Sequence, residues 1–142
     1  MYQILSYPIR ENQPTWPGNP TFHLEPRGSI AAGGKANTCT IHLFNHYGTH
    51  LDAPCHKSPN PKTIDQYPLE RFLVPAVVIE SMDPVSVKLA DVQGKEITPG
   101  CAVLLKTENS RSERSRVLPY EGAHVFVEPD ALKHIIDQGA SM

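Results

Sequence analysis

The chain has 142 residues and 39% hydrophobic residues, enough for one domain with a modest core, and its 14 prolines predict many loops and few long helices. A formal net charge of −2 gives no electrostatic case for binding nucleic acid. No apolar run approaches the roughly 20 residues of a membrane span, which excludes a membrane helix. The three cysteines lack paired spacing and no secretory signal is visible, so we expect a cytoplasmic protein with no nucleic-acid or membrane partner.

The first part of the chain predicts short strands joined by loops. Residues 4–9 form a short apolar run that indicates an edge strand closed by Pro8. Residues 22–25 alternate and residues 38–44 are β-prone, so both predict strands, with the glycine-bearing residues 28–37 as their connection.

Trp16 lies in a proline-rich loop, residues 11–20. A lone tryptophan is most often a hydrophobic plug, but its flat apolar face also suits the wall of a binding pocket. Both interpretations of Trp16 remain open from the residues alone.

Residues 46–56, with the sequence HYGTHLDAPCH, place three imidazoles and one carboxylate close together. Imidazole nitrogen and carboxylate oxygen suit zinc and similar divalent ions. His50 and Asp52 share a face of an extended segment, whereas a straight strand would separate His46 from His50 by roughly 13 Å. Gly48 supplies the freedom for the required bend. We therefore predict that His46, His50 and Asp52 bind one divalent ion, with zinc as first choice and manganese second.

His56 follows Pro54, which ends the extended segment and lets the chain turn. We expect His56 to stand near the ion without ligating it, as the catalytic general base or acid that carries a proton. The alternative is that His56 is a fourth ligand of a closed tetrahedral site.

The second half predicts an α/β fold with a mixed sheet. Residues 74–80 and 101–106 are continuous apolar runs, typical of strands covered on both faces. Residues 58–67 predict a polar loop at the rim of the site, residues 89–92 a helical turn, and residues 109–116 a solvated loop.

The C-terminal residues predict a helix that starts at residues 128–130 and ends at Gly139. In an α/β arrangement a buried strand should follow, but only residues 140–142 remain. We therefore expect a C-terminally truncated domain, or a processed fragment. Truncation would expose a strand edge and an apolar helix face, so we also expect self-association into a homo-oligomer.

The pattern His46-x-Gly48-Thr49-His50-x-Asp52-x-Pro54-x-His56 resembles the signature of the metal-dependent cyclase family, which includes bacterial-type kynurenine formamidases and isatin hydrolases. Flanking segments resemble the family in the same order, namely residues 4–9, 16–20, 75–80 and 102–107. The resemblance implies a swivelling β/β/α domain that pairs into dimers, with residues 1–142 as a single cyclase-like domain, incomplete at the C-terminus.

The same resemblance implies a hydrolase in which metal-activated water cleaves a C–N bond of an aryl formamide or cyclic amide, with Trp16 packed on the aromatic part of this small-molecule substrate. Ring closure or lactone chemistry by a sibling enzyme would use the same groups. Family members continue past this chain's last residue with a further His and Glu that help complete the metal site and its proton chemistry. A chain complete at Met142 would lack both groups, which puts its activity in doubt.

A second class of function is a non-catalytic metal-binding or interaction protein, a truncated pseudoenzyme that keeps the motif for stability. Metal binding contributes to folding free energy, so a ligand cluster can persist as a structural staple. The missing C-terminal part favours this interpretation, and the intact His56 argues against it. An assay for formamide hydrolysis with added zinc or manganese separates the two classes.

Overall fold

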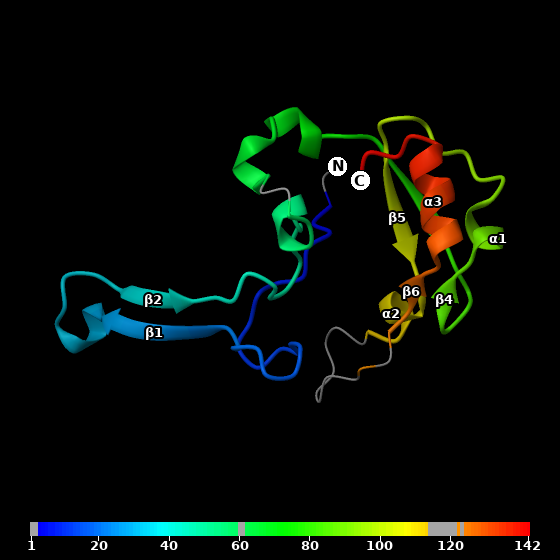
Figure 1. Cartoon of the computed structure of the whole chain (residues 1–142). Helices are drawn as coiled ribbons and strands as arrows, with labels where there is room; N and C mark the ends of the chain where they lie inside the picture. Colours follow the sequence, from blue (N-terminus) through cyan, green and yellow to red (C-terminus); the bar gives the residue numbers. More distant parts are fainter. Residues whose placement is uncertain (1–2, 60–61, 114–121, 123) are drawn as a thin grey trace. The chain divides into compact units, whose positions relative to one another are not determined.

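The computed structural model describes residues 3–59, 62–113, 122 and 124–142 (Figure 1). These residues divide into two compact units. Unit 1 holds residues 3–51, and unit 2 holds the described residues from Asp52 onward. The single-domain organisation expected from the sequence stays a prediction.

Unit 1 contains an antiparallel hairpin of β1 (His23–Gly28) and β2 (Thr38–His42). Its register pairs His23 with His42 and Leu24 with Ile41, so the two faces of the hairpin differ in polarity. The connection forms a short 3-10 helix, Ile30–Ala32. Both strands were predicted from the sequence, although β1 begins one residue later and runs further than expected.

Residues 4–9 do not form the predicted edge strand. Side chains satisfy their backbone groups instead: the Tyr7 N–H donates to Thr49 Oγ1 at 3.1 Å, and the Pro8 carbonyl accepts from Gln13 Nε2 at 2.9 Å. Ile4 stays 92% exposed. The sequence prediction failed here because an apolar run does not reveal which partner its backbone will find.

Unit 2 is built around two parallel strands, β3 (Ala76–Glu80) and β5 (Ala102–Lys106), in register from Ala76 opposite Ala102 to Glu80 opposite Lys106. The last residues of the chain lie along β5 as well. The Ser141 N–H donates to the Cys101 carbonyl at 2.8 Å, and the Val103 N–H donates to the Met142 carbonyl at 2.8 Å.

The remaining elements of unit 2 are short. Strands β4 (Ser86–Val87) and β6 (Phe126–Val127) pair in parallel. The α-helices are α1 (Leu89–Val92), α2 (Glu108–Arg111) and α3 (Pro129–Asp137), and the 3-10 helices are Pro54–His56, Ile64–Gln66 and Leu69–Phe72. The solvated loop predicted at residues 109–116 is partly the helix α2, and residues 114–116 lie outside the described residues.

Helix α3 ends as the sequence predicted. Gly139 adopts a left-handed φ of +86°, its N–H donates to the Ile136 carbonyl, and the Ala140 N–H donates to the Ile135 carbonyl. This pair of bonds is a Schellman motif, which satisfies carbonyls left over at the helix end.

The hydrophobic core of unit 2 lies where α1 and α3 cover one face of the strands. Its buried members are Ile79, Val87, Val92, Ile97, Cys101, Ala131 and Ile135. The other face stays open, with Val78 62% exposed. The expectation that β3 and β5 are covered on both faces is therefore wrong for this structure.

The predicted fold class is confirmed: the chain is α/β with few helices. The described strands form small two-stranded sheets, with antiparallel pairing in one and parallel pairing in the others. Among the described residues, no helix is long and apolar enough to cross a membrane.

Candidate metal centre

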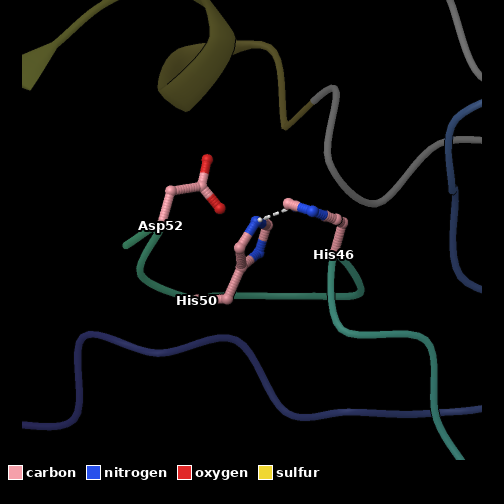
Figure 2. Close-up of side chains that lie close together, drawn as sticks. All are labelled: His46, His50 and Asp52. Carbon is pink, nitrogen blue, oxygen red and sulfur yellow. Dashed lines mark hydrogen bonds between the residues drawn. The ribbon is translucent and has the colours of Figure 1, made fainter. Parts of the chain in front are cut away.

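Three side chains from residues 46–52 gather at one point (Figure 2). His46, His50 and Asp52 each offer one ligand atom, and these atoms all lie within 4.8 Å of one another. In Figure 2 the Asp52 carboxylate faces the His50 ring from the side opposite His46. The sequence predicted that these residues converge, and the structure brings them together.

The bend that brings His46 back toward His50 occurs at Gly48. This residue has a left-handed φ of +70°, which side chains with a Cβ rarely adopt. The following Thr49 accepts the Tyr7 N–H through its hydroxyl at 3.1 Å, so the N-terminal segment holds the bend from outside. Local backbone geometry, rather than a regular strand, thus positions the cluster.

The imidazole of His50 is held from both sides. Its Nδ1 lies 2.9 Å from the Gly48 carbonyl, and its Nε2 lies 3.0 Å from His46 Nδ1. Since a carbonyl only accepts, Nδ1 is the donor, and Nε2 presents its lone pair toward His46 in the neutral ring. Metal-ligating histidines commonly use such a bond from the second nitrogen to fix their tautomer.

The spacing of the two rings suits a shared ion. Nitrogens at zinc distances of about 2.0–2.1 Å in a tetrahedral site lie about 3.3 Å apart, close to the 3.0 Å between His46 Nδ1 and His50 Nε2. His46 is half-buried, while His50 and Asp52 are exposed, so water can reach the cluster. Two nitrogens and one carboxylate oxygen with solvent access match the donor set of an open metal site.

Tyr47 supports the cluster and was not singled out in the sequence. Its side chain is only 3% exposed, its hydroxyl donates to the Arg10 carbonyl at 2.8 Å, and the same oxygen accepts the Gln13 N–H at 3.2 Å. The ring centroid lies 6.2 Å from that of Phe22. An aromatic residue between two candidate ligands is the only sequence signal that could have indicated this anchor.

The other two predicted site residues are not part of the three-residue cluster. His56 ends the 3-10 helix Pro54–His56, and its N–H donates to the Ala53 carbonyl at 2.9 Å. Trp16 is the first residue of a turn in which the Asn19 N–H donates to the Trp16 carbonyl at 3.0 Å. The Trp16 side chain is 58% exposed. Their catalytic and substrate-binding roles stay predictions.

An open hollow of about 380 Å³ lies in unit 1 next to the motif. Its lining includes Phe44, whose ring centroid is 5.7 Å from that of His46. The other lining residues are Pro20, Thr21, Ile41, His42 and Leu43. The hollow thus borders one ring of the cluster through Phe44.

A family model described as "Putative cyclase" matches residues 4–142. The chain is 28% identical over 118 residues to a kynurenine formamidase of Geobacillus thermodenitrificans, covering 82% of this chain and 56% of the relative. It is 26% identical over 123 residues to a kynurenine formamidase of Bacillus cereus, covering 85% and 59%. The chain therefore spans less than two thirds of the length of these curated relatives.

Two solved structures share the fold. One is titled a potential metal-dependent hydrolase with cyclase activity, and the other a predicted metal-dependent hydrolase from Bacillus stearothermophilus. Each superimposes with a TM-score of 0.73 at 24% identity and covers 95% of this chain. The matched part is 62% of the first structure and 63% of the second.

Proposed function

The chain belongs to the cyclase family, and from this membership we propose that it is a metal-dependent hydrolase that cleaves the C–N bond of an aryl formamide or a related cyclic amide. The observation that carries the proposal is the convergence of His46, His50 and Asp52 within 4.8 Å. This geometry supports a metal site, and family membership supports the class of reaction.

The proposed cofactor is a divalent ion held by His46, His50 and Asp52, with zinc as first choice and manganese as second. Mixed nitrogen and oxygen ligation suits both metals, so metal analysis must decide between them. When bound, such an ion would lower the pKa of a water to roughly 7 and polarise a carbonyl.

His56 is the proposed proton carrier of the site. A group that moves a proton between water and a leaving amine works best with a pKa near neutrality, and imidazole has that value unperturbed. His56 is the last residue of the 3-10 helix Pro54–His56, whereas His50 and Asp52 precede this turn, and its position supports a role other than ligand.

The aromatic part of the substrate is proposed to lie in unit 1, against Trp16 or in the hollow bordered by Phe44. Two observations support this placement: the Trp16 side chain is exposed, and Phe44 links the hollow to the His46 ring. Because both curated relatives are named kynurenine formamidases, an aryl formamide is the first substrate to assay.

The test is hydrolysis of an aryl formamide by the full chain with added zinc or manganese. Asp52→Asn should abolish metal retention and turnover together, because the amide is a weaker ligand than the carboxylate. Asp65→Asn is the matched control, since Asp65 is an exposed carboxylate in the 3-10 helix Ile64–Gln66. Stoichiometric metal binding without turnover on any aryl formamide or cyclic amide would overturn the enzymatic proposal and favour a non-catalytic metal-binding protein.

A further inference from the structure

The polar face of the β1–β2 hairpin carries a second pair of histidines. His23 and His42 lie directly opposite each other on the antiparallel strands, and their ring centroids are 6.0 Å apart with the planes inclined by 25°. Both side chains are more than half exposed, at 61% and 54%. The pair therefore lies on the surface of unit 1, outside residues 46–52.

Each of these rings is held by its own carboxylate. His23 Nδ1 lies 2.8 Å from Glu11 Oε1, and His42 Nε2 lies 3.2 Å from Glu25 Oε2. Glu11 also accepts the Leu24 N–H at 3.1 Å. Glu11 Oε1 therefore contacts both the His23 ring and the β1 backbone, which fixes the orientation of the ring. Arg27 Nη2 in turn donates to Glu25 Oε2 at 2.9 Å.

These contacts determine which ring nitrogens remain available. A carboxylate only accepts, so His23 donates from Nδ1 and His42 from Nε2. The lone pairs of the neutral rings then lie on His23 Nε2 and His42 Nδ1. Carboxylate–histidine pairs of this kind raise ligand basicity and fix ring orientation in many metal sites.

We propose that His23 and His42 form a second metal site that holds a divalent transition ion of the class that prefers imidazole. The two rings supply His23 Nε2 and His42 Nδ1, and water fills the other positions at this exposed surface. Among such ions Cu²⁺ heads the affinity order, so it is the probe of choice.

To share an ion, the two stacked rings must turn so that His23 Nε2 and His42 Nδ1 face a common point. Metal–nitrogen bonds of about 2.0–2.1 Å require ligating nitrogens no more than about 4 Å apart. Directly opposed residues of an antiparallel pair have Cβ atoms about 4.5–5.5 Å apart, a separation from which two imidazoles can reach one ion when Glu11 and Glu25 move with their rings. The competing interpretation is two ordinary surface ion pairs, which contribute little to stability and bind no metal.

The experiment is a Cu²⁺ titration of the full chain, with bound metal counted after desalting. Wild type should retain one equivalent more than His23→Gln and one more than His42→Gln. His124→Gln is the matched control, because His124 is an exposed histidine of unit 2 and its loss should leave the count unchanged. Identical counts for wild type and both hairpin variants would overturn the proposal.

Two further variants separate this site from the motif. His46→Ala should remove the ion bound by residues 46–52 and leave the ion bound by His23 and His42. The number of bound ions can therefore be measured for each site independently of the other. In His46→Ala protein, adding Glu25→Gln should weaken Cu²⁺ binding roughly 10–100-fold, the usual effect of removing the carboxylate behind a ligating histidine. Unchanged affinity after Glu25→Gln would contradict the assigned role of His42 Nδ1.

Discussion

The Gly48 carbonyl oxygen lies 2.9 Å from Nδ1 of His50, so the residue that bends the motif also fixes the ring of a candidate ligand. Replacing Gly48 with alanine should disturb both functions. The left-handed φ of +70° costs an alanine about 1–2 kcal/mol, while the added Cβ meets only Ile9 Cγ1 at an ordinary 3.5 Å. We expect Gly48→Ala to lower the free energy of unfolding by about that amount and to weaken metal binding, as measured by denaturant titration and calorimetry.

Gly94→Ala is the control for the strain itself. Gly94 has a similar φ of +76°, and an added Cβ would meet nothing within 4 Å. This variant should lose comparable stability with unchanged metal affinity. Equal metal affinity in Gly48→Ala and wild type would show that the bend does not organise the candidate site.

Tyr47→Phe tests the buried anchor next to His46. The change removes a hydroxyl that serves both the Arg10 carbonyl and the Gln13 N–H, which are then left without this partner. Such losses typically cost about 1–3 kcal/mol. Because the ring stays, we expect the fold to persist while metal affinity falls. Tyr67→Phe is the matched control, since Tyr67 is a half-buried tyrosine of unit 2.

Adjacent residues of α3 test where the core lies. Ile135 is 6% exposed and belongs to the core of unit 2, whereas Ile136 is 60% exposed. Ile135→Ala should cost about 2–5 kcal/mol of unfolding free energy, and Ile136→Ala should stay within about 0.5 kcal/mol. Similar losses in urea melts of both variants would mean that α3 packs through a different face.

The Asp83 carboxyl should make the free energy of unfolding depend on pH in the acid range. The Lys88 side chain, followed by the Val85 and Ser86 N–H groups, lowers the pKa of Asp83 from 3.8 to about 2. A carboxyl whose pKa is lower in the folded state than in the unfolded state stabilises the fold at pH values above its unfolded-state pKa. This contribution disappears as the pH falls through its folded-state pKa. The melting temperature of wild type should therefore exceed that of Asp83→Asn at pH 5 and above.

The difference in melting temperature between wild type and Asp83→Asn should narrow between about pH 4 and pH 2, where wild-type Asp83 becomes protonated. Asp137→Asn removes an exposed ion pair with Lys133 and serves as the control for a simple loss of surface charge. A constant difference in melting temperature across this range would contradict the assignment.

The motif could be predicted from the sequence because its information is local. Residue type, the two-residue spacing of His50 and Asp52, and the bend allowed by Gly48 suffice to place three ligand atoms together. The helix end at Gly139 was predictable for the same reason, since a Schellman motif depends on adjacent residues.

Features that depend on distant partners were not predictable in this way. The apolar run at residues 4–9 suggested a strand, but its backbone bonds go to the side chains of Thr49 and Gln13. Val78 lies in a continuous apolar run, yet α1 and α3 cover only the opposite face. Tyr47 has no periodic signal, and only the fold shows which carbonyl its hydroxyl finds.

Two neighbouring backbone amides of β5 donate to different partners, so their hydrogen exchange measures the opening of different contacts. The Ala102 N–H donates to the Pro75 carbonyl beside β3, while the Val103 N–H donates to the Met142 carbonyl. Because amide hydrogens exchange with solvent deuterium only when their bonds open, Ala102 reports separation of β3 from β5. Val103 reports release of residues 141–142 from the opposite edge of the strand. A single exchange measurement on adjacent residues can thus distinguish fraying of the terminal residues from opening of the central strand pair.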